Sequence, residues 1–199
     1  MKILAPLIAA AALSSGASPG FAQDPINDNF ADRVELTGVP VTAFGENLNA
    51  TKEAGEPNHG LNLGGGSVWW TWTAPTAGIF EIDLRASAFD TLLGIYTGNA
   101  VDDLIPLVFN DDASVVPQVV QSRALVSLKA GETIHIAADG FGDGTAFANG
   151  DIQLDIRLGP AGPSNDNFAS AIDLGSVLGI SVNGNNVNAT REIGEPGPS

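Results

Sequence analysis

The sequence contains no cysteine among its 199 residues. Disulfide bonds, thiolate metal sites and cysteine catalysis are therefore excluded. Basic residues are also scarce, with 8 lysines and arginines against 23 aspartates and glutamates, so the formal net charge is −15. Proteins that bind nucleic acid or anionic membrane surfaces carry clustered lysine and arginine. We therefore expect no nucleic-acid partner.

Long apolar runs are absent except at the N-terminus, where Ile3–Leu13 follows the positively charged Lys2. Gly20 and Ala22 occupy the −3 and −1 positions of a cleavage site. The run is well short of the ~20 residues that a membrane-spanning helix needs, which favours a signal peptide over residues 1–22. The alternative is a buried N-terminal helix. We expect a protein that is secreted, periplasmic or at the cell surface, without membrane insertion.

All three tryptophans lie in the segment Ser67–Pro75, which is rich in aromatic and β-branched residues and is typical of a strand. Alternation along a strand places Trp70 and Trp72 on one face, which we expect to centre the core. Trp69 then lies on the other face. It is either an exposed ligand-binding ring that stacks on a sugar or contacts a partner, or it is covered by a loop such as Gly60–Gly66.

Two motifs in this sequence occur twice and in the same order. Asn27–Ala31 recurs as Asn165–Ala169, and Asn49–Pro57 recurs in modified form as Asn188–Pro196. The period is that of a domain rather than of a solenoid unit. The second copy has no counterpart of the tryptophan segment, and roughly 40 residues without that strand can hardly bury a core.

We therefore expect a sandwich domain over residues 23–159, then a linker and an incomplete second repeat over residues 160–199. Within the first domain, alternating apolar residues predict further strands. These are Gly78–Arg85, Thr91–Tyr96, Leu104–Phe109, Arg123–Leu128, Glu132–Ala138 and Asp151–Leu158.

Turn signals at 75–78 and 129–131 predict that the strands on either side form hairpins. One short helical turn is predicted over 29–34. Seven or eight short strands, each with one polar face, predict an all-β antiparallel sandwich.

Seven segments, in order along the first domain, resemble those of the bacterial pre-peptidase C-terminal (PPC-like) domain family. They are Asn27–Phe30, Ala50–His59, Ser67–Pro75, Phe89–Leu93, Tyr96–Gly98, Asn110–Asp112 and Ala138–Gly142. The resemblance implies a jelly-roll-like β-sandwich, appended in tandem to secreted enzymes and surface proteins. Members of the family are usually non-catalytic, and some relatives bind calcium or a polymeric substrate. This sequence contains no peptidase domain.

The two histidines offer little catalytic chemistry. His135 alternates with Ile134 on a predicted strand, so we expect it at the surface. His59 lies in a predicted loop, where we expect a solvated residue, with a metal site shared with Glu53 and Glu56 as the alternative. No nucleophile-elbow or His-Glu-x-x-His motif is present, so we expect no enzyme and no catalytic residues.

Carboxylates at strand ends are the better candidates for a site. Asp111 and Asp112 follow a predicted strand, Asp28 opens the domain, and residues 139–144 form an acidic, glycine-rich loop. Such oxygen ligands suit calcium, which predicts a structural calcium site at Asp28, Asp111 and Asp112. The alternative is turn chemistry, because tight turns need asparagine, aspartate and glycine anyway. We expect no other cofactor.

The sequence thus predicts a secreted, non-catalytic β-sandwich module for adhesion, substrate targeting or spacing beside other extracellular domains. Its partner would be an extracellular protein or polysaccharide, and the module would be a monomer or part of a larger multidomain chain. The alternatives are a carbohydrate-binding module, which requires an exposed Trp69, an accessory fragment of a secreted peptidase, and an enzyme that acts through its acidic loops.

Overall fold

The computed structural model describes residues 24–176 and 179–195. The predicted signal peptide lies outside the described residues. Among the described residues, helix is limited to four 3-10 turns. None of these helices has the length and apolar character needed to cross a membrane. The turns are η1 (Phe30–Asp32), η2 (His59–Leu61), η3 (Val101–Asp103) and η4 (Phe168–Ser170). The first of them confirms the short helical turn predicted near residue 30.

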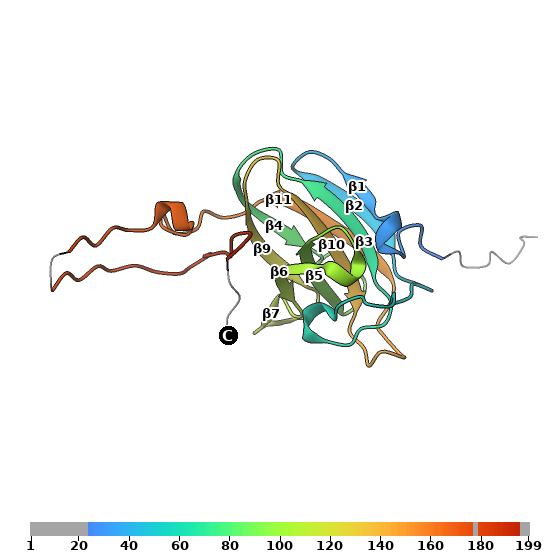
Figure 1. The fold of residues 1–199 in the computed structure, drawn as a ribbon. Helices are drawn as coiled ribbons and strands as arrows, with labels where there is room; N and C mark the ends of the chain where they lie inside the picture. Colours follow the sequence, from blue (N-terminus) through green and yellow to red (C-terminus); the bar gives the residue numbers. More distant parts are fainter. Residues whose placement is uncertain (1–23, 177–178, 196–199) are drawn as a thin grey trace, which may run out of the picture.

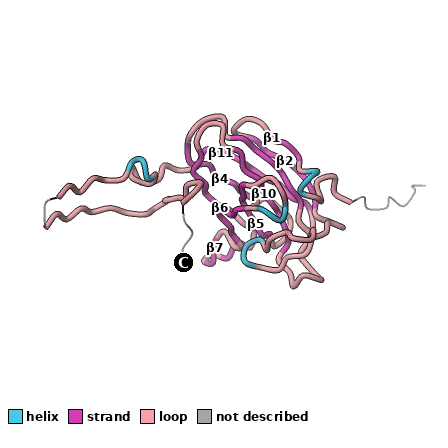
Figure 2. The backbone as a smooth tube through the Cα atoms, in the orientation of Figure 1, coloured by secondary structure: helices cyan, strands magenta, loops and turns pink. Residues whose placement is uncertain are grey.

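The strands form two packed sheets, so the all-β sandwich is confirmed (Figures 1 and 2). The first sheet has the order β1 (Val34–Leu36), β3 (Val68–Thr73), β10 (Thr133–Gly140), β5 (Thr91–Thr97) and β6 (Ile105–Asn110). The second has the order β2 (Val41–Glu46), β11 (Asp151–Leu158), β4 (Gly78–Asp83) and β9 (Arg123–Leu128). A separate small hairpin joins β7 (Ser114–Val115) and β8 (Gln118–Val119). Neighbouring strands are antiparallel except for β1 and β3, which run parallel.

The core between the two sheets follows the predicted alternation. Trp70 and Trp72 point inward from β3, and Phe80 and Ile82 point inward from β4, all at most 1% exposed. The rings of Trp72 and Phe80 meet edge to face across the layers, with centroids 4.9 Å apart. Burying each such apolar side chain contributes about 1.5–3 kcal/mol, which makes the interior of the sandwich its main source of stability.

The two predicted hairpins are wrong. β3 and β4 belong to different sheets, and so do β9 and β10, so each turn carries the chain from one sheet to the other. Two strands that follow one another in the sequence can pair within one sheet or face each other from two packed sheets. Both arrangements bury the apolar face of each strand. The alternation therefore sets which side chains point inward, but it does not set which strands are hydrogen-bonded.

β1 and β2 had no counterpart among the predicted strands. β1 has three residues, too few for a period to be counted, and it pairs with Trp70–Trp72 of β3. β2 places small residues inward: a side chain at Gly45 would come within 3.1 Å of the Trp70 ring. Its bulky residue, Phe44, points outward and is 76% exposed. The usual hydrophobic signal is therefore missing from this strand.

After β11 the chain leaves the sandwich, extends away from it and returns beside β9 (Figure 1). The described residues beyond 159 form no strand. Their apolar side chains at Ile172, Leu174, Ile180 and Val182 are 48–50% exposed. The division of the chain into a domain over residues 23–159 and an incomplete repeat over residues 160–199 stays a prediction.

Candidate functional site

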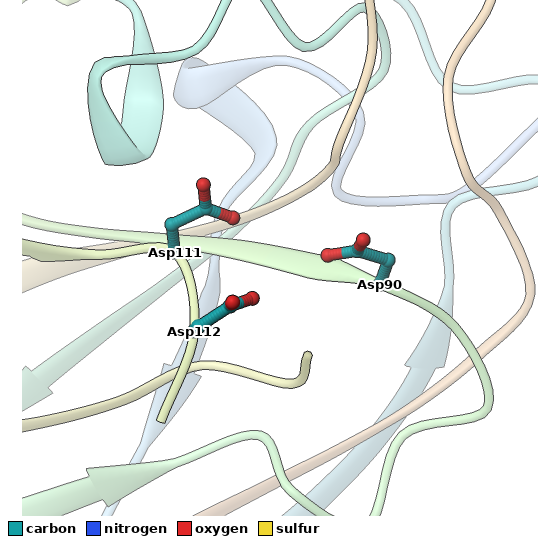
Figure 3. Close-up of side chains that lie close together, drawn as sticks. All are labelled: Asp90, Asp111 and Asp112. Carbon is teal, nitrogen blue, oxygen red and sulfur yellow. The ribbon is translucent and has the colours of Figure 1, made fainter. Parts of the chain in front are cut away.

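Three carboxylates gather at one edge of the first sheet. Asp90 precedes β5, and Asp111 and Asp112 follow its antiparallel neighbour β6, so the start of one strand lies beside the end of the other. One oxygen from each side chain lies within 4.8 Å of the other two. Figure 3 shows the three carboxyl groups pointing toward a common centre.

The electrostatics of this group suit a cation. Burial raises the pKa of Asp90, and the neighbouring charges of Asp111 and Asp112 raise it further. Burial and the charge of Asp112 likewise raise the pKa of Asp111. One oxygen each of Asp90 and Asp111 is buried without a hydrogen-bond partner among the described residues. Because calcium binds carboxylate oxygens at about 2.3–2.6 Å, the donor set fits a hard divalent cation.

Asp28, the third predicted ligand, is not part of this group. Its carboxylate accepts hydrogen bonds from the backbone N–H and the hydroxyl of Thr51, at 2.6 and 2.9 Å. Asp90 takes its place because the register Leu93↔Asn110 brings the start of β5 beside the end of β6. The signal for Asp90 was its position just before a predicted strand, but the pairing of that strand could not be predicted from the sequence.

The acidic loop predicted over residues 139–144 is only partly a loop, because β10 extends to Gly140 and includes Asp139. Asp139 is fully buried and accepts backbone N–H groups of Gly65, Gly66 and Gly140. Asp143 caps the next turn, where the backbone N–H of Ala146 and the hydroxyl and N–H of Thr145 hold the pKa of Asp143 at about 2. Both carboxylates therefore hold backbone N–H groups in place, and Asp143 does so in a turn, as the alternative interpretation predicts.

Trp69 is fully buried, so its ring cannot stack on a sugar in this structure. It forms a second apolar cluster on the outer face of the first sheet with Phe30, Tyr96 and Ala137. The ring of His59 also packs edge to face against it, with centroids 5.4 Å apart. The predicted alternation is right, and so is the alternative that Trp69 is covered, because the segments carrying η1 and η2 lie over this face.

The same covering corrects the expectation for His59, which is fully buried and not solvated. Its Nε2 lies 2.8 Å from Glu56 Oε1, and its Nδ1 lies 2.7 Å from the Tyr96 hydroxyl. Ser67 donates to the same Glu56 oxygen at 2.5 Å. The serine proton thus faces a carboxylate and not the imidazole, so this buried network lacks the order of a catalytic triad.

His135 is also buried, at 6% exposed, and the surface position predicted for it is wrong. Its Nε2 hydrogen-bonds to the carbonyl of Gly98 at 2.8 Å, and its ring meets Phe30 edge to face. Burial lowers the pKa of His135, and the nearby charge of Arg33 lowers it further. Both histidines therefore act as packed polar side chains on the outer face of the first sheet.

The outer face of the second sheet holds an ion-pair cluster. Glu81 and Asp83 point outward as predicted, yet they are only 6% and 5% exposed because three arginine side chains cover them. Those side chains belong to Arg85, Arg123 and Arg157. Three of the eight basic residues of the chain thus neutralise two buried carboxylates and leave little positive charge for an acidic partner.

An open cleft of about 660 Å³ lies beside the edge strands β1 and β2, with Trp70 among its lining residues. Ile26 and Phe44 also line it and are 75% and 76% exposed. The cleft also contains three carboxylates, those of Asp24, Glu46 and Asp151. This cleft could not be predicted from the sequence, because Ile26 and Phe44 lie in segments where no strand is predicted.

No family model and no curated protein matches this sequence. Among solved structures, the chain is similar to the pre-peptidase C-terminal domain of collagenase from Bacillus anthracis, with a TM-score of 0.40 and 11% identity over 63% of this chain and 94% of that one. It is also similar to the ANXUR1 extracellular domain from Arabidopsis thaliana, with a TM-score of 0.26 and 14% identity over 67% of this chain and 45% of that one. The first is a domain of the family that the sequence motifs resemble.

Proposed function

We propose that this chain is a secreted, non-catalytic β-sandwich module that attaches neighbouring extracellular domains to a polysaccharide through the cleft beside β1 and β2. The observation that carries the proposal is the exposure of Ile26 and Phe44 in a cleft that also holds three carboxylates. An aromatic face can pack on the apolar face of a sugar ring, and carboxylates accept hydrogen bonds from its hydroxyls. Phe44 thus takes the carbohydrate-binding role that the sequence offers as an alternative for Trp69.

The internal pairing of the buried polar groups supports a non-catalytic role. The imidazole of His59 is engaged on both nitrogens by Glu56 and Tyr96, away from solvent. A general base must reach the proton of a bound substrate, and this one is fully buried against the outer face of the first sheet. The activity to test is therefore binding to a polysaccharide and not its hydrolysis.

The test is a pull-down of residues 23–199 on insoluble cellulose, chitin, xylan and peptidoglycan, with soluble sugar measured in the same tubes. Wild type is expected to be retained on at least one of them without product release. The Phe44→Ala variant is expected to lose most of that retention, whereas Val116→Ala, at a residue 85% exposed outside the cleft, keeps it. Product release, or equal retention of the two variants, would contradict the proposal.

We also propose that Asp90, Asp111 and Asp112 hold a structural calcium ion. The support is the convergence of the three carboxylates and the two buried oxygens that lack a hydrogen-bond partner among the described residues. Calcium titration calorimetry at pH 7 tests this site. One binding event is expected from wild type and none from the Asp111→Asn, Asp112→Asn double variant. An equal heat of calcium binding in the two proteins would argue against the site.

A further inference from the structure

Both copies of the repeat form the same local structure, which we call the clasp: two separated segments joined by side-chain carboxylates. In the first copy Asp28 accepts the backbone N–H of Thr51, and Glu53 accepts that of Phe30, at 2.6 and 2.5 Å. In the second copy the corresponding distances are 2.8 and 2.7 Å. Those pairs are Asp166 with Thr190, and Glu192 with Phe168.

The backbone of the two clasps also agrees. Gly55 and Gly194 both have a φ of 89°, in the left-handed region that favours glycine. Asn49 and Asn188 have φ values of 62° and 58°, a conformation that asparagine tolerates better than most residues. The second clasp is therefore a formed piece of structure, although the described residues beyond 159 contain no strand.

The second clasp contacts the first sandwich. Arg191 donates from Nη1 to the carbonyl of Pro106 at 3.1 Å. Ser127 of β9 donates from its hydroxyl to Asn167 at 3.1 Å. Ile193 packs, partly buried, against the main hydrophobic core. Around these contacts a cavity of about 160 Å³ is lined from both sides, by β4 and β9 of the sandwich and by the clasp.

Two of the residues that make these contacts, Arg191 and Ile193, distinguish the second copy from the first. Within the motif Asn49–Pro57, the second copy differs at two positions, where Lys52 is replaced by Arg191 and Ala54 by Ile193. In the first copy Lys52 bonds within its own loop, to Asn58 and to the carbonyl of Leu63. Ala54 is exposed to solvent.

The linker is held as well. Gly159 donates its backbone N–H to the carbonyl of Ile79 at 2.9 Å. A side chain at Gly162 would come within 2.7 Å of the Ile79 side chain, so the linker runs close over β4. A flexible tether would have neither contact.

We propose that successive repeats of this chain dock directly on one another, with the clasp (residues 166–170 and 188–195) seated beside the start of β4 and the end of β9. Ile193 is the apolar anchor of this interface, and Arg191 orients the clasp through the Pro106 carbonyl. The interface sets a fixed angle between repeats, so that a tandem array is a spacer of defined geometry and not a chain of freely moving modules.

Distance measurement between two spin labels tests this directly, because the protein has no native cysteine to interfere. Labels at Thr76→Cys and Ala189→Cys, both exposed positions, report the sandwich and the clasp in residues 23–199. One narrow distance distribution is expected for the otherwise unchanged chain. Ile193→Ala, which restores the residue of the first copy, is expected to broaden it several-fold.

Two further variants complete the experiment. Arg191→Lys also restores the first-copy residue and is expected to broaden the distribution while leaving the clasp bonds of Asp166 in place, as slow amide exchange at Thr190 would show. Ile180→Ala, at a residue 48% exposed outside the contact, is the matched control and is expected to change nothing. A broad distribution in the unchanged chain, or a narrow one in both Ile193→Ala and Arg191→Lys, would overturn the proposal.

Discussion

Phe30 and Trp69 meet edge to face, with ring centroids 5.2 Å apart and planes at 89°. Phe30 is 3% exposed in this contact, whereas Phe168, the same residue of the second copy, is 87% exposed. One motif therefore has a packed aromatic partner in the first repeat and a solvent-facing side chain in the second. Comparing Phe30 with Phe168 therefore shows how much packing against the tryptophan strand contributes to stability.

Phe30→Ala should lower the free energy of unfolding by about 3–5 kcal/mol, the range for truncating a large buried aromatic. Phe168→Ala should change it by less than about 0.5 kcal/mol, as exposed substitutions do. Chemical denaturation followed by tryptophan fluorescence measures both. Similar losses for the two variants would show that Phe168 is packed in solution.

Trp69→Ala and Trp70→Ala should be equally damaging, each by about 3–5 kcal/mol. The two rings lie on opposite faces of β3, but both faces are covered, and each ring is at most 1% exposed. Urea unfolding of the two variants makes the comparison. A small loss for Trp69→Ala alone would mean that the cover over the outer face opens readily.

Asp83→Asn should destabilise the protein by about 1–3 kcal/mol at pH 7, because it removes a charged partner of Arg85 and Arg157. Burial raises the pKa of Asp83, but the hydrogen bonds from the two arginines outweigh it, so the pKa lies below its ordinary value of 3.8. A lowered pKa gives stability that is present above 3.8 and lost as the pH falls through the folded-state value. The gap between wild type and variant should therefore close in acid, and a gap independent of pH would contradict the ion pair.

Calcium should raise the melting temperature of the protein, because a ligand that binds only the native state stabilises it. Magnesium should raise it less, since it demands a tighter octahedral site. The Asp111→Asn, Asp112→Asn double variant should lose the response, whereas Asp28→Asn should keep it. An equal shift in sodium chloride of matched ionic strength would indicate general screening of an acidic surface and no site.

The cluster of Asp90, Asp111 and Asp112 should change the stability of the protein with pH in the opposite direction to Asp83. The pKa values of Asp90 and Asp111 are raised, first by burial and then by neighbouring carboxylates. Their contribution to stability is full below 3.8 and is lost as the pH rises through the raised values. Without calcium, the double variant should therefore become more stable relative to wild type as the pH rises from 3 to 7, measured by thermal unfolding. A constant difference would show that the carboxylates do not repel one another.

The sequence predicts inward-facing side chains well and predicts contacts between distant segments poorly. Phe80 and Ile82 are buried as their alternation requires, since the period of a strand is a local property. The burial of Trp69 and His59 depends instead on segments folded over the outer face of the first sheet. Asp90 joins Asp111 only through the register of β5 and β6, which no local pattern specifies. The signal peptide, the bound calcium and the partner stay predictions.

We expect the sandwich of residues 23–159 to bind the polysaccharide without the residues that follow it. The most direct test is equilibrium binding of that fragment to the insoluble polysaccharide that retains residues 23–199, with tryptophan fluorescence confirming that it is folded. The same bound fraction is expected for the fragment and for the longer chain, with no soluble product. A folded fragment that is not retained would contradict it.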